Sequence, residues 1–392
     1  MTHFLKDILR QPEELQRTIE LFAGTNGAGR ATLEAAAAAI RSARHVYLTG
    51  IGSSWHAALN VGAMFYQHAH PVYLLDADEL LRFGAFPRNS AMIIISRSGK
   101  STEIVQLARK ASKAGVKVIG ITNVPESPLG KEANHAIVVP IALDHAISVN
   151  TYTTLALAVG MLASRVVQEG SSLQGLKPSE KGTGAPELKL RPGKDSELAE
   201  SLSHAFAEAG RAIPAWQELI AKSVWLKPHS AAYFLARGSS LGSACEARLI
   251  WEEGVKSPAS SMGTGSFRHG PQEIVNKGVR FGIWIDGTQM REQDFALARD
   301  LRKLGASVML IGQKLPEDAG DLVFQLPAIP AGWQSLIDII PAQLVAERLA
   351  GLSAVDCDTF RLSSFIVEDE GGLLPKEARN SEDSAAKDAA SE

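Results

Sequence analysis

A short hydroxyl-rich loop separates an apolar run from a helical pattern. The loop, Ser96–Thr102, has serine or threonine at positions 96, 98, 101 and 102 and glycine at position 99. The run before it, Met92–Ile95, is typical of a buried parallel strand, and Glu103–Ala114 has helical spacing. The N–H groups of a first helical turn lack partners, and the helix dipole favours negative charge there. We therefore predict that this loop binds the phosphate of a sugar phosphate. An ordinary helix cap is the alternative.

A second loop of small and hydroxyl residues, Gly50–Ser54, follows the first predicted strand. It is not the dinucleotide-binding fingerprint, because the third glycine of that motif would fall at Trp55. In open α/β sheets, ligands bind at the carboxyl ends of the strands. We expect the strands before Gly50 and Ser96 to be neighbours. Their loops would then converge, which favours a phosphate site more strongly than either loop alone.

Two groups able to transfer protons lie in the second half of the chain. Glu253 ends a predicted helix, one to two turns after Glu246, and His269 lies in a glycine-rich stretch. Beside a bound sugar, a carboxylate can move a proton between adjacent carbons, and a histidine can serve the ring oxygen or carbonyl. The plainer interpretations are an exposed helical glutamate and a histidine that stabilises a turn. No spacing of His, Cys and acidic residues in the sequence specifies a metal.

The elements that would position these groups alternate between strand and helix, which predicts an α/β fold with parallel sheets covered by helices on both faces. The predicted strands of the first half are His45–Leu48, Val72–Leu75, Met92–Ile95, Val116–Ile121 and Ala136–Pro140. Those of the second half are Ala232–Ala236, Val279–Ile285, Ser307–Ile311 and Leu322–Leu326. Helical patterns include 1–24, interrupted at Pro12, and a pair near Ser196–Ala209 and Ile213–Leu226.

The second half repeats the first. Gly238–Ser240 corresponds to Gly52–Ser54, while the place of Ser96–Thr102 is taken by Asp286–Met290. A carboxylate repels phosphate. We therefore predict that the two halves share a fold and that the anion site belongs to the first.

Composition gives the remaining boundaries. Residues 169–194 are rich in Gly, Pro, Ser and Lys and predict a linker, whereas 369–392 are polar and predict a disordered tail. The expected organisation is N-terminal helices over 1–44, a phosphosugar-binding subdomain over 45–168, the linker, a second subdomain with the catalytic Glu and His over 195–368, and the tail.

Charge and cysteine content narrow the classes of partner. The net charge of -3 gives no electrostatic reason to bind nucleic acid or an anionic membrane. Two cysteines, Cys245 and Cys357, cannot build a disulfide scaffold, and the N-terminus lacks the pattern of a signal peptide. A cytoplasmic location is expected.

Several motifs together resemble the sugar isomerase (SIS) family, and most of all the isomerase module of glutamine:fructose-6-phosphate amidotransferase. The likeness covers about residues 3–368. The matching motifs are Lys6–Pro12, Gly50–Ala57 (GIGSSWHA), Ile95–Ser101 (ISRSGKS), Ile121–Val124, Ser127–Leu129, Ser148–Thr154, and Glu253 at its spacing from His269-Gly270-Pro271.

The resemblance implies two tandem SIS subdomains, each a flavodoxin-like three-layer unit, and no metal or organic cofactor. It implies phosphate contacts from Ser53, Ser54, Ser96, Arg97, Ser98 and Ser101. Glu253 would be the base that acts at C1 and C2. His269 would assist ring opening and reach the site of a neighbouring subunit, so that a homodimer shares its active sites.

Three departures from the family pattern bear on the reaction. The resemblance begins with the isomerase module, so no glutamine hydrolysis is expected. Arg97 replaces a family glutamine, which adds a cation beside the phosphate and can change the ligand. Serines, Ser363 and Ser364, stand in the segment where the family carries a lysine that forms an imine with the ketose. The likeness therefore does not extend to imine formation.

The expected function is aldose–ketose isomerisation of a hexose phosphate or amino-sugar phosphate, alone or coupled to amination or deamination as with glucosamine 6-phosphate. The alternative is a non-catalytic sugar-phosphate sensor. The sequence shows no attached helix-turn-helix pattern or basic DNA-binding patch, and it keeps both Glu253 and His269, which a sensor does not need.

Overall fold

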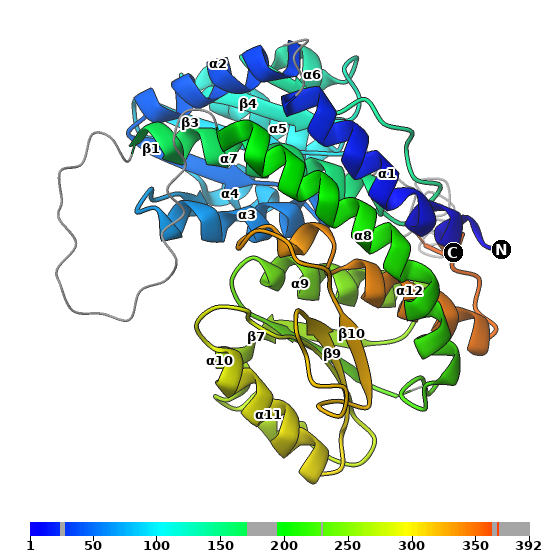
Figure 1. Cartoon of the computed structure of the whole chain (residues 1–392). Helices are drawn as coiled ribbons and strands as arrows, with labels where there is room; N and C mark the ends of the chain where they lie inside the picture. Colours follow the sequence, from blue (N-terminus) through cyan, green and yellow to red (C-terminus); the bar gives the residue numbers. More distant parts are fainter. Residues whose placement is uncertain (24–27, 171–193, 229, 363–366, 368–392) are drawn as a thin grey trace, which may run out of the picture.

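Parallel sheets in the two halves of the chain form its framework (Figure 1). The structure, a computed structural model, describes residues 1–23, 28–170, 194–228, 230–362 and 367. The predicted linker 169–194 lies almost wholly outside the described residues, and the predicted tail 369–392 lies entirely outside them. Within the described residues, no helix is long and apolar enough to cross a membrane.

The first sheet has the strand order β2-β1-β3-β4-β5, and all its strands are parallel. Its strands are β1 (His45–Thr49), β2 (Tyr73–Leu74), β3 (Ser90–Ile95), β4 (Lys117–Thr122) and β5 (His135–Val138). The central strand β3 is buried throughout. This is the flavodoxin-like order, in which ligands bind where the strand order reverses, here between β1 and β3.

The second sheet has the order β10-β9-β8-β6-β7, again parallel. Its strands are β6 (Ala232–Ala236), β7 (Ala259–Gly263), β8 (Arg280–Trp284), β9 (Ser307–Gly312) and β10 (Leu322–Gln325). Counted from the first strand of each half, this order is the same as that of the first sheet. The predicted fold class, two units of parallel sheet covered by helices, is confirmed.

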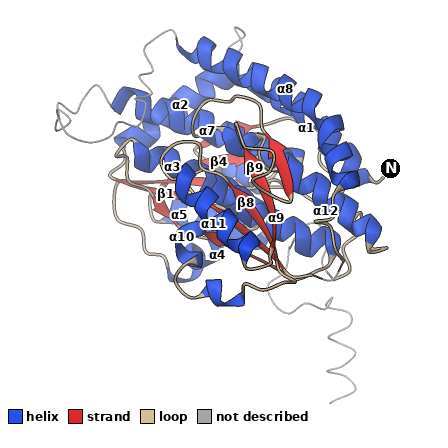
Figure 2. Cartoon of the chain, turned by 60° about the horizontal axis from the view of Figure 1, so that its bottom comes forward, coloured by secondary structure: helices blue, strands red, loops and turns tan. Residues whose placement is uncertain are grey.

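Helices cover both faces of each sheet (Figure 2). Those of the first half are α1 (His3–Ala23), α2 (Ala28–Ser42), α3 (Ser53–Gln67), α4 (Ala77–Phe83), α5 (Thr102–Lys113), α6 (Pro128–Glu132) and α7 (Asn150–Gly170). Those of the second half are α8 (Lys194–Lys222), α9 (Ser240–Ile250), α10 (Thr264–Phe267), α11 (Arg291–Lys303) and α12 (Ile340–Leu352). A π-helical turn, η1 (Trp251–Val255), continues α9, and 3-10 turns lie at η2 (Pro271–Ile274) and η3 (Gln334–Leu336).

Among the described residues, buried apolar side chains form three clusters. The largest joins the inner faces of both sheets to α1, α2, α3, α7, α8, α9 and α12. A second lies between the first sheet and α4, α5 and α6, and a third between the second sheet and α10 and α11. The shared inner cluster therefore holds the two halves in one body.

The sequence-based assignment of elements was right for each predicted strand, with ends shifted by at most two residues, and wrong in three other places. The predicted pair of helices around residue 210 is one helix, α8, with Pro214 inside it; likewise α1 continues through Pro12. Strand β7 was missed because its sequence, Ala-Ser-Ser-Met-Gly, is small and polar, and it lies at the sheet edge.

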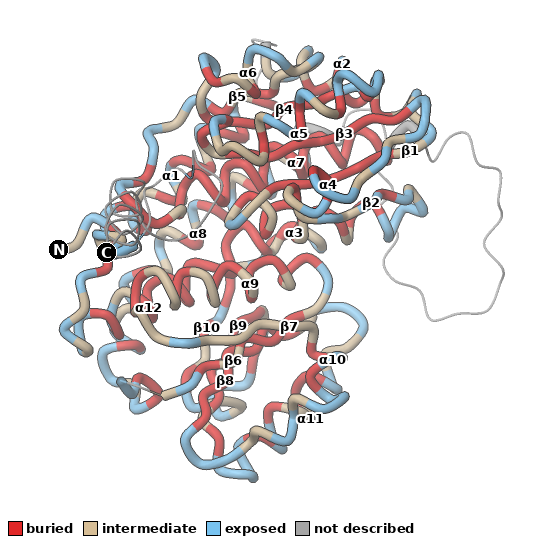
Figure 3. The backbone as a smooth tube through the Cα atoms, turned by 180° about the vertical axis from the view of Figure 1, so that it is seen from behind, coloured by how far each residue is buried: buried red, intermediate tan, exposed pale blue. Residues whose placement is uncertain are grey.

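The contact between α3 and α9 sets how the halves meet, and Figure 3 shows the buried course of α9 between them. Gly242 of α9 lies against α3, and a Cβ at that position would stand 2.1 Å from Asn60 Oδ1 and 2.2 Å from the His56 carbonyl oxygen. Asn60 is itself fully packed and donates a hydrogen bond to Tyr152 Oη at 2.6 Å. The absence of a side chain at Gly242 therefore permits the close approach.

We expect Gly242→Ala to lower the free energy of unfolding by about 2 kcal/mol or more, since neither a backbone carbonyl nor the packed Asn60 can easily give way. Gly351→Ala is the matched control, because Gly351 is also helical and a Cβ there meets nothing within 4 Å among the described residues. Thermal denaturation of both variants tests this. Equal melting temperatures would contradict the close approach of α3 and α9.

Candidate functional site

Two loops meet at the carboxyl edge of the first sheet because the strands before them are paired. Thr49 of β1 lies opposite Ile94 of β3, so the loops that begin at Gly50 and Ser96 leave the sheet side by side. Gly52 has φ 57° and Gly99 has φ 61°, conformations that favour glycine. A Cβ at Gly99 would also stand 2.2 Å from Ser127 Oγ. The convergence predicted from the strand pattern is confirmed.

The Ser96–Thr102 loop is held by its own side chains. Ser96 Oγ accepts a hydrogen bond from the Gly99 N–H at 3.0 Å, and Ser98 Oγ accepts one from the Lys100 N–H at 3.2 Å. Ser101 is the N-cap residue of α5, but among the described residues its side chain makes no capping hydrogen bond. A hydroxyl accepting one hydrogen bond can still donate its proton to an anion.

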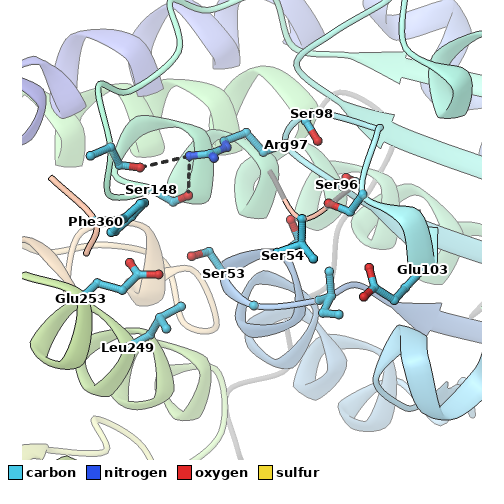
Figure 4. Close-up of a pocket in the computed structure, with 15 residues that line it drawn as sticks. Ser53, Ser54, Ser96, Arg97, Ser98, Glu103, Ser148, Leu249, Glu253 and Phe360 are labelled. Atoms are coloured by element: carbon cyan, nitrogen blue, oxygen red, sulfur yellow. Dashed lines mark hydrogen bonds between the residues drawn. The ribbon is translucent and has the colours of Figure 1, made fainter. Parts of the chain in front are cut away.

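A pocket of about 260 Å³ opens in front of these loops and reaches the second half of the chain (Figure 4). It is lined by Ile51, Gly52, Ser53, Ser54, Ser96, Arg97, Ser98, Ser101, Glu103, Ala146, Ser148, Leu249, Glu253, Phe360 and Val367. The six residues predicted to bind phosphate and the predicted base Glu253 are all among them. Serine-rich loops of the first half thus share one cavity with a carboxyl group of the second.

Glu253 reaches the pocket from η1, the π-helical turn at the end of α9. Such wide turns occur often at functional sites. Burial raises the pKa of Glu253 to about 8; the nearby Glu246 adds to the increase, and Arg97 and Lys256 oppose it. At pH 7 this carboxyl is therefore mostly protonated, and it ionises near pH 8.

Arg97 extends along the pocket wall. Its Nη1 donates to the Ala146 carbonyl oxygen at 3.3 Å and to Ser148 Oγ at 3.2 Å (Figure 4). The guanidinium lowers the pKa of Glu253 from across the cavity. The side chain of Arg97 therefore extends from the serine loop toward Ala146 and Ser148 and lines the same cavity as Glu253.

A buried carboxylate connects the two halves directly behind the pocket. Glu246 of α9 is fully buried; its Oε1 accepts a hydrogen bond from Ser53 Oγ at 3.0 Å, and its Oε2 lies 2.7 Å from His56 Nδ1. This pairing orients the Ser53 side chain. His56 of α3 thus has a hydrogen-bond partner from the opposite half.

His269 lies outside the described residues that line the pocket. It is exposed, in the turn between α10 and η2, where its N–H donates to the Ser266 carbonyl oxygen at 3.0 Å. The structure thus places Glu253 at the cavity of its own chain and His269 on the surface.

The corresponding loop of the second half holds a carboxylate of the chain itself. Asp286 accepts hydrogen bonds from the N–H groups of Thr288, Gln289 and Met290 at 2.9–3.0 Å. Burial alone would raise the pKa of Asp286, but these hydrogen bonds outweigh burial and lower it. The N–H groups at the start of α11 are therefore already bound to an anion.

Several pocket residues were not found from the sequence. Glu103, Leu249, Phe360 and Val367 line the cavity, yet none stands in a chemically distinctive motif. Leu249 carries a weak signal, since it precedes Glu253 by one helical turn.

Ser363 and Ser364, which stand where a lysine was expected, lie outside the described residues. Among the described residues, no group of three His, Cys, Asp or Glu side chains could hold a metal ion.

Comparison with known proteins agrees with this fold and pocket. Residues 39–165 match the SIS domain family. The chain is 24% identical over 366 residues to a glutamine–fructose-6-phosphate aminotransferase (isomerizing) of Symbiobacterium thermophilum, and 27% identical over 371 residues to that of Aeropyrum pernix. These alignments cover 91% of this chain and 57% and 55% of the relatives, so the chain spans little more than half of their length.

Solved structures share the architecture over nearly the whole chain. The C-terminal domain of glucosamine-fructose-6-phosphate aminotransferase from Francisella tularensis superposes with a TM-score of 0.77 at 20% identity, covering 91% of this chain and 97% of that one. A glucosamine-6-phosphate deaminase from Thermotoga maritima gives 0.72 at 22% identity, covering 93% and 99%. A tagatose-6-phosphate ketose/aldose isomerase from Escherichia coli gives 0.72 at 17% identity, covering 96% and 97%. The chain carries a SIS domain and is homologous to the isomerase module of the glutamine–fructose-6-phosphate aminotransferases.

Proposed function

We propose that this protein is a sugar-phosphate enzyme that interconverts an aldose and a ketose, alone or with gain or loss of an amine at C2. The observation that carries the proposal is a single cavity lined by two serine-rich loops and by a carboxyl group whose pKa is raised to about 8. The names of its relatives support a hexose 6-phosphate or amino-sugar phosphate as substrate.

The serine loops bind the phosphate and thereby fix the sugar chain. Hydroxyl groups of Ser54, Ser96, Ser98 and Ser101 donate to phosphate oxygens, helped by the N-terminal dipole of α5. Ser53 already donates to Glu246, so it serves by holding its loop in place. Anchored at one end, the sugar extends along the pocket toward Glu253.

Glu253 then carries the proton between carbons. As a carboxylate it removes a proton from C1 of the ketose while water gives a proton to the C2 carbonyl oxygen, which produces an enediol. It returns its proton to C2 while the C1 hydroxyl gives up its proton to water and becomes the aldehyde. A raised pKa makes the carboxylate a stronger base, at the cost of a smaller ionised fraction at neutral pH.

His269 acts in a second copy of the chain under this proposal. It is exposed and outside its own pocket, which suits a residue that completes the site of a neighbouring subunit in a homodimer. There it assists opening of the sugar ring. No metal or organic cofactor takes part in the steps proposed for these residues.

We expect Glu253→Gln to slow proton exchange at C1 and C2 by roughly a hundredfold or more, because the amide cannot accept the proton. The exchange is followed by NMR in deuterated water with fructose 6-phosphate and glucosamine 6-phosphate, and sugar binding should persist. Glu252→Gln is the control, since Glu252 pairs with Arg248 at 2.5 Å on the same turn. Binding without exchange in the unmodified protein would favour the sugar-phosphate sensor.

The rate should follow the ionisation of the same carboxyl group. Because burial raises the pKa of Glu253 to about 8, kcat/KM should rise about tenfold per pH unit from pH 6 toward pH 8 and level off above it. To check this, kcat/KM is determined at each pH from rates measured over a range of fructose 6-phosphate concentrations. A flat profile over that range would exclude Glu253 as the base.

Removal of two loop hydroxyls should weaken phosphate binding. Ser98→Ala combined with Ser101→Ala should reduce the affinity for fructose 6-phosphate roughly tenfold or more, since hydrogen bonds to charged groups are lost. Calorimetry measures the affinity, with Ser112→Ala, on the exposed side of α5, as control. Unchanged affinity would place the phosphate elsewhere.

A further inference from the structure

Lys256 ends the turn that carries Glu253, in a conformation that a lysine adopts only at a cost. Its φ is 56° and its ψ is 34°, the left-handed region that helices usually reserve for glycine after their last turn. Glycine would relieve this strain. Glycine, however, could not make the contacts of the lysine ammonium group.

The ammonium group of Lys256 joins two walls of the pocket. Nζ donates to the carbonyl oxygen of Glu253 and to that of Thr359, the latter at 2.9 Å. It also lies 5.9 Å from the centroid of the Phe360 ring, within range of a cation–π contact. Glu253 and Phe360 both line the pocket, so one cation holds η1 against the segment 356–360.

Charged groups from several elements face this pair. Glu246 of α9 and Glu252 of η1 disfavour the carboxylate form of Glu253, while Arg97 from the serine loop and Lys256 favour it. Around Lys256 stand Asp356, Cys357 and Arg361 as well as Glu253. Burial lowers the pKa of Lys256, and Asp356 opposes that change most strongly.

We propose that Lys256 is a positioning residue for Glu253: its ammonium group fixes the π-helical turn to the C-terminal segment, and its charge favours the ionised carboxyl group. The expected effect on turnover rests on the proposed role of Glu253 as the base. The expected effect on the ionisation of Glu253 does not. Lys256 itself lies outside the described pocket lining and is bonded to two backbone carbonyls. It forms no covalent bond with the sugar.

Lys256→Gly tests this inference because it separates stability from function. Glycine suits the left-handed backbone, so thermal stability should be kept or raised, while the amine is lost. Lys256→Arg keeps a cation at the position. Lys314→Gly is the matched control, since Lys314 is another left-handed lysine, with φ 51°, on an exposed turn, and it is not among the described residues that line the pocket.

The titration of Glu253 is the direct measurement. In protein labelled with [δ-13C]glutamate, the Glu253 signal is identified by its loss in Glu253→Gln. Its midpoint should move to higher pH in Lys256→Gly, remain unchanged in Lys314→Gly, and stay near the unmodified value in Lys256→Arg. An unchanged midpoint in Lys256→Gly would overturn the proposal, whether or not the protein turns over any sugar.

Turnover provides the second measurement. With fructose 6-phosphate, kcat should fall roughly tenfold in Lys256→Gly with little change in KM, as expected when a base is misplaced rather than a ligand lost. A rise in KM with an unchanged kcat would contradict a positioning role. Treatment with borohydride in the presence of fructose 6-phosphate should leave Lys256 unmodified, and an adduct at Lys256 would overturn the inference.

Discussion

The buried carboxylate of Glu246 is the interaction on which the geometry of the pocket depends. A charge removed from water is costly unless it is paired and hydrogen-bonded, and the partners of Glu246, Ser53 and His56, both come from the opposite half of the chain. The carboxylate therefore stabilises one relative placement of α3 and α9. Because Glu253 follows Glu246 by two helical turns, the same contact directs Glu253 toward the serine loops.

The two halves show how one topology can leave a helix start beside a cavity in one half and fill the equivalent place with a carboxylate in the other. Both sheets have the same strand order, and each has a loop and a helix start where an anion can bind. In the second half, Asp286 occupies the N–H groups at the start of α11. In the first half, Ser98 and Ser101 line a cavity. The two loops differ in the side chain of Asp286, which the comparison of the two halves of the sequence had already singled out.

Local patterns were enough to predict the strands other than β7 and the convergence of the two serine-rich loops. Buried parallel strands are continuous apolar runs, as in β3, and their order follows from short connections of fixed hand. Glu253 was found because its spacing to His269 follows a family motif. Strand β7 and helix α8 were misjudged where tertiary packing overrides local propensity: small serines still pair at a sheet edge, and Pro214 is accommodated within a helix.

The rest of the site depends on contacts between distant segments. Phe360 and Lys256 are over a hundred positions apart from each other and meet only because the segment 356–360 returns to η1. Asp358 contributes to that return, since its carboxylate accepts hydrogen bonds from the N–H groups of His3 and Phe4 at 2.8 Å. Periodicity and composition carry no information about such a contact.

The charge balance of the pocket gives Arg97 a physical role. A phosphate dianion bound at the serine loop would disfavour ionisation of Glu253, because two negative charges repel in a partly buried site. Under the proposed function, phosphate binding and ionisation of Glu253 would therefore compete. Arg97 lines the same cavity and favours the ionised form of Glu253, so its positive charge would offset part of that repulsion. A glutamine at that position could donate hydrogen bonds but could not offset charge. The substitution thus suits a site in which the carboxyl group is strongly buried and no lysine from the described C-terminal segment enters the cavity.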